Sequence, residues 1–202
     1  MTARPLLIAL SLAALAGGVA AQPAAKRPAA PRYETAVFAG GCFWCTEADF
    51  EKVAGVVAAE SGYTGGTQAN PTYDQVSGGR TTHIEAVRVT YDPRRISYRQ
   101  LVDRFWPTID PTDDGGQFCD RGATYRTAVF VTPAQRPQAE ASRAAAAKKL
   151  KRGRMLTPIR PAARFWPAEA YHQDFYKKNP LRYRVYRQGC GRDAQLDRVW
   201  GR

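Results

Sequence analysis

Residues 33–53 read YETAVFAGGCFWCTEADFEKV, and this stretch determines how the fold begins. Residues 33–39 combine aromatic and β-branched side chains and predict a short strand. Gly40 and Gly41 then break the strand, because paired glycines favour a turn. A helix is expected from Cys42 to the end of the stretch. This strand–turn–helix order places Cys42 at the N-terminus of the helix.

The rest of the chain continues the alternation of strands and helices. Further strands are expected at residues 56–63, 84–91 and 125–131, and further helices at residues 97–106 and 133–151. The order is therefore β-α-β-β-α-β, which predicts an α+β fold. Its form is a two-layer, ferredoxin-like (split βαβ) sandwich with a mainly antiparallel sheet. Beyond it we expect an extended segment at residues 158–165, a short helix at residues 168–177 and an irregular, basic C-terminal tail over residues 179–202.

The first 21 residues predict an export signal. Arg4 supplies a positive charge, and the apolar run over residues 6–15 is too short to span a bilayer. Val19, Ala20 and Ala21 are small residues of the kind that a signal peptidase reads. We therefore expect cleavage after Ala21 and export, with the periplasm as the destination. An Ala/Pro-rich linker over residues 22–32 would lead into a catalytic domain over residues 33–178.

The charge of the chain is concentrated in its last third. The net charge is +12, and residues 141–202 hold 16 Lys and Arg against 4 Asp and Glu, whereas residues 1–140 are balanced. A basic segment suits an anionic partner, and Arg and Tyr alternate over residues 181–187 in a way that can stack on bases. Because export separates the chain from nucleic acid, we expect no nucleic-acid partner. A weak contact between this basic third and an anionic surface is the remaining expectation.

Cys42 and Cys45 form a Cys-x-x-Cys pair at the predicted helix N-terminus. Free backbone N–H groups and the helix dipole stabilise a thiolate there, and the thiolate is the nucleophilic form of cysteine. Such a pair also suits a general dithiol–disulfide oxidoreductase. Two inert buried thiols, or a structural disulfide in an exported protein, are further interpretations.

Other residues could support chemistry at Cys42. Glu85 alternates with apolar neighbours in a predicted strand, so its carboxyl could be half-buried and protonated at neutral pH. Asp120 lies next to Cys119 in a loop, Tyr125 begins the next predicted strand, and Tyr73 lies in a Gly-rich loop. The four cysteines with His83 and His172 have irregular spacings and no second close pair, so we expect no metal site.

Taken together, these motifs resemble one family, the peptide-methionine (S)-S-oxide reductases (MsrA). The resemblance covers roughly residues 33–180, and its motifs occur in order along the chain. They are Gly41-Cys42-Phe43-Trp44 with Glu47, Ser61-Gly62-Tyr63-Thr64-Gly65-Gly66, Asn70-Pro71-Thr72-Tyr73, Gly79-Arg80-Thr81, His83-Ile84-Glu85-Ala86-Val87, Tyr91-Asp92-Pro93, Phe105-Trp106, Asp110-Pro111, Asp120-Arg121-Gly122, Tyr125-Arg126, Tyr171-His172-Gln173-Asp174 and Asn179-Pro180.

The resemblance implies a role for each candidate residue. Cys42 would attack the sulfoxide sulfur as a thiolate, and Glu85 would protonate the sulfoxide oxygen. Tyr73 and Tyr125 would donate hydrogen bonds to that oxygen. Phe43 and Trp44 would form an apolar pocket for the substrate methyl group, and Asp120 would order the polar side of the site. The products would be methionine and a sulfenic acid on Cys42. No bound cofactor is implied.

The resemblance also implies recycling through an intramolecular disulfide that an external, thioredoxin-like dithiol reduces. Many relatives have glycine where this chain has Cys45, and a cysteine soon after the Asn-Pro motif where it has Tyr183 and Arg184. The resolving cysteine is therefore predicted in the order Cys190, Cys119, Cys45. We expect a monomer that acts on proteins containing methionine sulfoxide, and on the free amino acid as a further substrate.

Overall fold

The computed structural model describes residues 32–201, so the predicted export signal lies outside the described residues. β1 (Glu34–Gly40) is followed by a two-residue turn and α1 (Phe43–Glu51). The chain continues through β2 (Val56–Thr64), β3 (Ile84–Tyr91), α3 (Tyr98–Phe105) and β6 (Thr127–Val131). These elements have the predicted order β-α-β-β-α-β, and their bounds differ from the predicted ones by a few residues.

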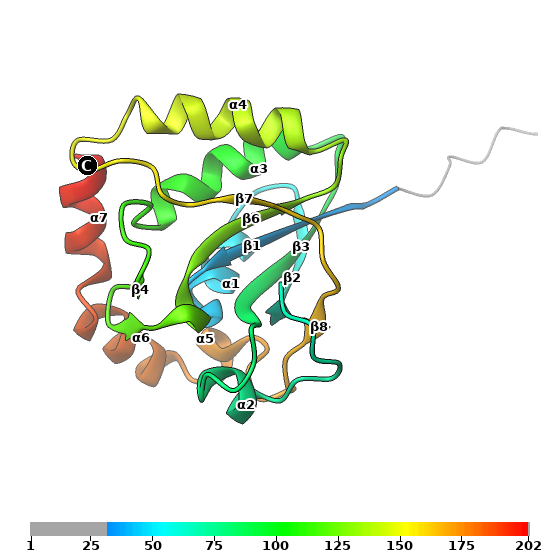
Figure 1. Ribbon diagram of the computed structural model, residues 1–202, viewed down its shortest axis with the longest axis vertical. Coiled ribbons are helices and arrows are strands. Elements are labelled where there is room, and N and C mark those ends of the chain that lie inside the picture. The colour runs from blue at the N-terminus through cyan, green and yellow to red at the C-terminus, as the bar shows by residue number, and fades with distance from the viewer. Residues whose placement is uncertain (1–31, 202) are drawn as a thin grey trace, which may run out of the picture. The chain divides into compact units, whose positions relative to one another are not determined.

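A six-stranded sheet forms the centre of the fold, with the strand order β7-β6-β1-β3-β2-β8 (Figure 1). β7 (Ile159–Pro161) and β8 (Trp166–Pro167) are short strands at its two edges. Neighbouring strands are antiparallel except β6 and β7, which α4 (Arg136–Ala147) connects. The four central strands follow the order of a split βαβ sandwich, so the predicted α+β class with a mainly antiparallel sheet is confirmed.

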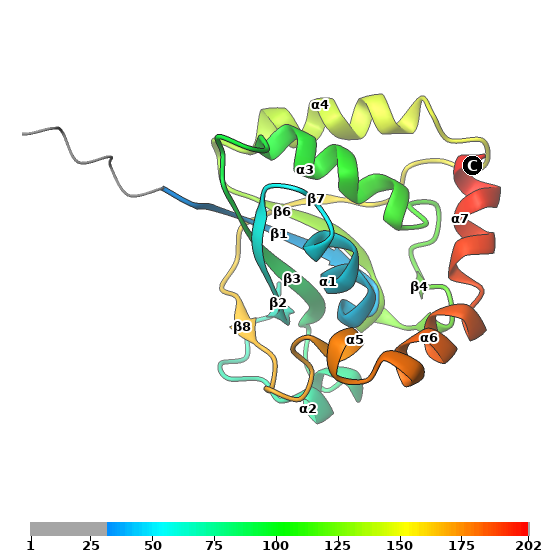
Figure 2. The same ribbon diagram turned by 180° about the vertical axis from the view of Figure 1, so that it is seen from behind.

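The main core lies between this sheet and the helices α1 and α3, which lie on one face of it (Figure 2). Phe38 on β1 illustrates the packing, because its ring centroid lies 4.6 Å from that of Phe50 on α1 and 5.0 Å from that of Phe105 on α3. Burial of each such side chain contributes about 1.5–3 kcal/mol. The rigid core thus fixes α1, whose first turn carries the Cys-x-x-Cys pair.

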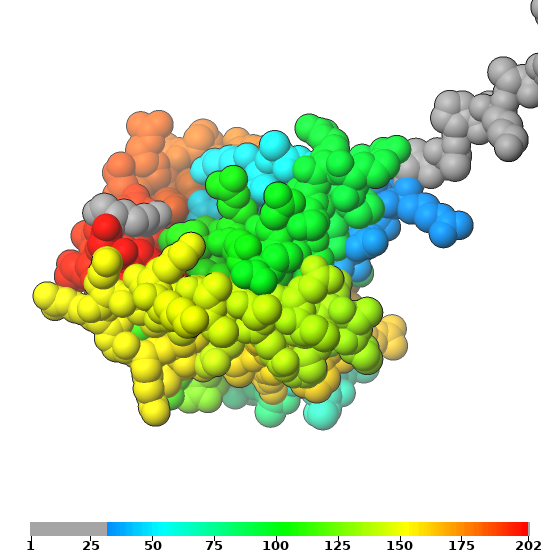
Figure 3. Space-filling model, turned by 90° about the horizontal axis from the view of Figure 1, so that it is seen from above, coloured from blue at the N-terminus to red at the C-terminus, as the bar shows by residue number. Residues whose placement is uncertain are grey.

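Short elements occupy the two long loops between the central strands. α2 (Tyr73–Ser77) lies between β2 and β3, and the ribbon of β4 (Gly116–Gln117) and β5 (Asp120–Arg121) lies between α3 and β6. Two 3-10 helices, Trp106–Thr108 and Ala123–Tyr125, flank that ribbon. Seen from above, α4 and the segment that follows it cover one end of the described fold (Figure 3). Within residues 32–201 no helix is both long and apolar enough to cross a membrane.

The prediction of an irregular C-terminal tail is wrong. α6 (Pro180–Gly189) and α7 (Arg192–Trp200) follow the four-residue α5 (Phe175–Lys178), and α5 is all that forms of the helix predicted at residues 168–177. α7 is anchored at both ends, since the Arg192 guanidinium donates to the Thr108 carbonyl at 2.5 Å and the Trp200 indole donates to the Ile109 carbonyl at 2.9 Å. High charge hides these helices in the sequence, because few apolar positions mark their buried faces.

Candidate active site

The turn before α1 places Cys42 at the N-terminus of that helix. Gly41 has a φ of +82°, and a Cβ added there would lie 2.5 Å from Cβ of Gln117, so the residue must be glycine for the β4 strand to pack against the turn. The Cys42 carbonyl accepts the backbone N–H of Cys45 at 3.2 Å and that of Thr46 at 3.3 Å. Cys42 is therefore the N-cap residue, and its thiol lies beside the positive end of the helix dipole.

Cys42 and Cys45 are a buried pair of free thiols, with 7% and 1% of their surfaces exposed. Burial raises the pKa of Cys42, and the hydrogen bond from the Cys42 thiol lowers the pKa of Cys45 to about 7. One negative charge therefore forms within the pair near neutral pH. The charge lies on Cys45 and Cys42 keeps its proton, which differs from the expectation that the helix N-terminus favours the Cys42 thiolate, because burial outweighs the helix dipole.

Glu85 lies directly against the base of α1. Its carboxyl accepts the backbone N–H of Phe43 at 2.9 Å, and only 2% of the residue is exposed. Burial raises the pKa of Glu85 to about 8, so the carboxyl is protonated at neutral pH and can donate a proton close to Cys42.

Tyr73, Tyr125 and Asp120 surround the same space from three other elements. Burial raises the pKa of both tyrosines, and their hydroxyls interact electrostatically with Glu85 and Cys42. Both therefore remain neutral hydrogen-bond donors. Burial also raises the pKa of Asp120, which interacts with Glu85 and accepts a hydrogen bond from Tyr186. The structure thus brings together all five residues predicted as catalytic.

Phe43 and Trp44 lie in an aromatic cluster around the first turn of α1. The Trp44 ring stacks on Phe175 at 3.6 Å between centroids, and Phe43 lies 6.5 Å from Tyr73 and 4.9 Å from His172. The Trp44 indole donates to Nδ1 of His172 at 3.0 Å, so the neutral imidazole carries its proton on Nε2. The two side chains thus lie in an apolar environment, and their role as a pocket for the substrate methyl group stays a prediction.

Cys119 and Cys190, the two first-ranked candidates for the resolving role, form a disulfide with each other. The bond joins the β4–β5 ribbon to the C-terminal end of α6, with 5.0 Å between the two Cα atoms. Cys45 is the third candidate, and its free thiol lies next to Cys42. Which of the three captures a sulfenic acid on Cys42 stays a prediction.

Three residues that line the site have no catalytic or pocket role in the sequence-based prediction. Tyr186 contacts Asp120 and Cys42, His172 orients Trp44, and Glu169 accepts the backbone N–H of Tyr73 at 2.8 Å. The motif at residues 171–174 was a signal for His172. The pattern that includes Tyr186, the alternation of Arg and Tyr over residues 181–187, predicts a contact with an anionic partner instead.

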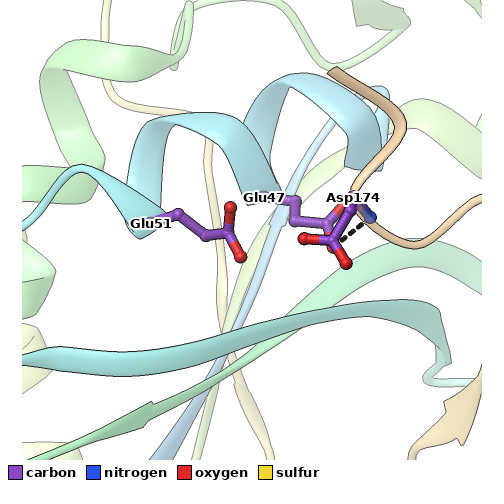
Figure 4. A group of neighbouring side chains, drawn as sticks. All are labelled: Glu47, Glu51 and Asp174. Carbon is purple, nitrogen blue, oxygen red and sulfur yellow. Dashed lines mark hydrogen bonds between the residues drawn. The ribbon is translucent and has the colours of Figure 1, made fainter. Parts of the chain in front are cut away.

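A second group of acidic side chains lies beside α1, two of them on the helix itself. Glu47, Glu51 and Asp174 bring their carboxylates within 4.8 Å of one another (Figure 4). Glu47 accepts from the hydroxyl of Ser61 at 3.1 Å and from the backbone N–H of Asp174 at 3.1 Å. The Lys177 ammonium pairs with Glu51 at 2.7 Å and with Asp174 at 2.8 Å. Hydrogen bonds and a single ammonium group thus hold the three carboxyl groups in place.

The fold and the site define a thiol-dependent oxidoreductase. A nucleophilic cysteine at a helix N-terminus lies beside a protonated carboxyl and neutral phenols, which suits the reduction of a polar oxide whose oxygen must be protonated.

Comparisons with known proteins agree with this class. The peptide methionine sulfoxide reductase family model matches residues 34–202. A protein of Caulobacter vibrioides named peptide methionine sulfoxide reductase MsrA 2 is 60% identical over 195 residues, which cover 96% of this chain and 98% of the relative. The chain therefore belongs to the peptide methionine sulfoxide reductase family, in its MsrA group.

Solved structures support the same fold. Methionine sulfoxide reductase A of Corynebacterium diphtheriae is similar at a TM-score of 0.64 and 34% identity, over 76% of this chain and 78% of that one. Reduced Mxr1 of Saccharomyces cerevisiae gives a TM-score of 0.65 and 30% identity, over 77% and 89% of the two chains. Mxr1 has also been solved in complex with Trx2, and that likeness, at 23% identity, concerns the fold alone.

Proposed function

We propose that this enzyme reduces the S epimer of methionine sulfoxide in proteins, and in the free amino acid, to methionine. The Cys42 thiolate attacks the sulfoxide sulfur while Glu85 gives a proton to the sulfoxide oxygen. The sulfur–oxygen bond of the substrate breaks, and the oxygen passes as hydroxyl to Cys42. Methionine leaves, and Cys42 holds a sulfenic acid. The substrate sulfur gains two electrons and the cysteine sulfur loses them.

The observation that carries this proposal is the contact of Glu85 with the first turn of α1. A carboxyl of pKa about 8, bonded to the N–H next to Cys42, supplies a proton where a nucleophilic thiol attacks. Tyr73 and Tyr125 add neutral donors for the sulfoxide oxygen. A dithiol–disulfide oxidoreductase, the alternative considered from the sequence, has no use for these three groups.

The two functions are separated by turnover of separate sulfoxide epimers with dithiothreitol as the reductant. We expect the wild type to consume the S epimer of a methionine sulfoxide peptide and to leave the R epimer, and Cys42→Ser to form no methionine. Insulin reduction that depends on both Cys42 and Cys45, with no sulfoxide consumed, would instead establish the alternative.

We further propose that the sulfenic acid on Cys42 condenses with the thiol of Cys45, releasing water and forming a disulfide. Cys45 is the free thiol closest to Cys42, and its pKa of about 7 makes its thiolate abundant at neutral pH. The two thiols are already hydrogen-bonded to each other, so the Cys42 sulfur faces that of Cys45. A resolving role for Cys190 requires the Cys119–Cys190 disulfide to open first.

Disulfide mapping by mass spectrometry after one equivalent of substrate tests this assignment. We expect a Cys42–Cys45 linkage in the wild type, with the Cys119–Cys190 linkage retained. The double variant Cys119→Ser/Cys190→Ser should form the Cys42–Cys45 linkage as well. A peptide that links Cys42 to Cys190 would transfer the resolving role to Cys190.

The reductant, the cofactor and the location of the enzyme form the last part of the proposal. We propose that an external, thioredoxin-like dithiol reduces the internal disulfide and that no bound cofactor takes part, because the cysteines carry all the electrons that the reaction needs. We also propose that the chain is exported and acts as a monomer in the periplasm. The predicted signal and the disulfide, which persists in oxidising compartments, support that location.

A further inference from the structure

Tyr186 reaches from α6 to two groups of the site at once. Its hydroxyl donates a hydrogen bond to Oδ2 of Asp120 and lies within hydrogen-bonding reach of the Cys42 sulfur. Its ring meets that of Trp44 edge to face, with 5.7 Å between centroids. A partly buried phenol thus connects a carboxyl to the nucleophilic thiol.

The Cys119–Cys190 disulfide holds both ends of this connection. Cys119 directly precedes Asp120, and Cys190 follows Tyr186 by one helical turn and donates its backbone N–H to the Tyr186 carbonyl at 3.0 Å. The disulfide therefore ties the β5 strand to the last turn of α6. Without this bond, α6 would hold Tyr186 against the site only through noncovalent contacts.

The Tyr186 hydroxyl has one proton, so it can donate a hydrogen bond either to Asp120 or to Cys42. Each of these groups is stabilised by that bond when it is an anion. When Asp120 is ionised, the Tyr186 hydroxyl donates to it, and the Cys42 thiolate has no donor from this side. When Asp120 is protonated, its own O–H can donate to the phenol oxygen, and the Tyr186 hydroxyl is free to donate to Cys42. A thiolate that receives such a bond is stabilised.

On the basis of the proposed function, we propose that Tyr186 is a positioning residue that couples protonation of Asp120 to formation of the Cys42 thiolate, and that the Cys119–Cys190 disulfide maintains this coupling. In the coupled step the thiol of Cys42 loses one proton and the carboxylate of Asp120 gains one. No electrons are exchanged. The phenol passes the hydrogen bond from the carboxyl to the sulfur and ends with its own proton count unchanged.

Several charged or titratable groups face this chain of three residues and enter its pH dependence. Glu85, Tyr73 and Tyr125 each interact electrostatically with both Asp120 and Cys42. Arg192 on α7 faces Asp120, and Cys45 faces Cys42. Burial raises the pKa of Asp120, and this lets the carboxyl accept the proton.

The test is the pH dependence of Cys42 alkylation by iodoacetamide, with tandem mass spectrometry to separate Cys42 from Cys45. Tyr186→Phe keeps the ring and removes the hydroxyl. In a plot of the Cys42 alkylation rate against pH, the rising limb should therefore move to higher pH. A shift of one pH unit lowers the rate at pH 7 about tenfold. Alkylation does not require sulfoxide turnover, so its outcome is separate from that of the proposed function.

Tyr183→Phe is the matched control, because Tyr183 lies one turn earlier on α6 and its hydroxyl meets Arg187. This variant should keep the wild-type limb. Asp120→Asn removes the carboxylate charge and leaves the Tyr186 hydroxyl free to donate to Cys42, so it should shift the limb in the opposite direction, to lower pH. Adding Tyr186→Phe to Asp120→Asn should remove the part of that shift that depends on the hydroxyl. An unchanged limb in Tyr186→Phe, or a rate lowered equally at every pH, would overturn the coupling.

The double variant Cys119→Ser/Cys190→Ser tests the disulfide in the same assay. We expect the limb to move in the direction seen for Tyr186→Phe, by a smaller amount, because Arg192 still anchors α7 to the Thr108 carbonyl. A wild-type limb in this variant would remove the disulfide from the proposal.

Discussion

At the scale of single residues, the chemistry of this site depends on keeping a carboxyl protonated. Glu85 lies on a central strand with apolar residues on both sides, and the protein core removes the water that would stabilise its charge. Its one strong hydrogen bond, from the Phe43 N–H, favours the charged form but does not offset burial. Buried carboxyls of this kind are kept for proton transfer at the cost of stability.

Glu85→Gln should abolish the acid step with little change in shape. Loss of a general acid lowers the rate by about 10²–10⁴-fold. Because the acid form is the active one and the pKa of Glu85 is about 8, wild-type kcat/KM should decline as pH rises through 8. The check is a pH–rate profile of S-epimer reduction. Glu85→Gln should lose this decline along with its rate, and an unchanged rate would exclude Glu85 as the acid.

The same carboxyl sets a pH dependence of stability. The native state binds its proton with a pKa of about 8, above the value of 4.5 for an exposed glutamate, so the native state holds more protons than the unfolded chain between these values. The contribution of Glu85 to the free energy of unfolding is therefore full below pH 4.5 and is lost as pH rises through 8. Thermal unfolding of wild type and Glu85→Gln should show the wild type losing stability relative to the variant from pH 5 to pH 8.

At the same scale, sequence could indicate some groups of the site and not others. Cys42 and Glu85 could be found because local patterns mark them: paired glycines before a cysteine, and a lone acid in an apolar strand. Tyr186 could not, because its role depends on where α6 packs, and the pattern of residues 179–202 carries no clear apolar stripe. The cysteine pairing was equally open, since four cysteines allow three complete pairings.

At the scale of elements, the C-terminal helices depend on specific anchors more than on a continuous core. α6 and α7 bury few side chains, chiefly Tyr183, Leu196 and Val199. Arg192 is 2% exposed and lies over the Phe118 ring at 4.4 Å, so the ribbon and α7 are held together by a cation on an aromatic face. The Cys119–Cys190 disulfide adds a covalent connection from the ribbon to the C-terminal end of α6, just before α7 begins.

Removal of that disulfide should therefore lower stability measurably. The two cysteines are 71 residues apart, and a bond that closes a loop of this size contributes about 2–4 kcal/mol. Urea unfolding of Cys119→Ser/Cys190→Ser should give a lower midpoint than that of the wild type. Wild type unfolded in the presence of a reductant is the control and should reach the same midpoint. Equal midpoints for the variant and the oxidised wild type would contradict a stabilising role.

At the scale of the whole molecule, the basic excess of the last third now has partners. Arg187 pairs with Asp49 on α1 at 3.1 Å, and the Arg143 guanidinium on α4 donates to the carbonyls of Met155 and Thr157. Arg187 therefore connects α6 to α1, and Arg143 connects α4 to the segment that precedes β7. The β-α-β-β-α-β order was predictable because the periodicities of strands and helices are local. A contact such as Arg187 with Asp49 joins residues far apart in the chain, so it could not be predicted from the sequence. A weak contact with an anionic surface remains a proposal for the cations left exposed.

The two edges of the sheet have a consequence for how this protein meets other chains. β7 has three residues and ends at Pro161, and β8 has two and ends at Pro167. Proline has no N–H to offer, so β7 and β8 themselves present only short rows of free donors and acceptors, whereas β2 is covered by β8 at Gly62 and Tyr63 alone. An enzyme that acts on oxidised polypeptides encounters chains that have partly lost their fold. The two outermost strands, each ended by a proline, offer such chains few backbone groups to pair with, so any pairing is expected first along the uncovered part of β2.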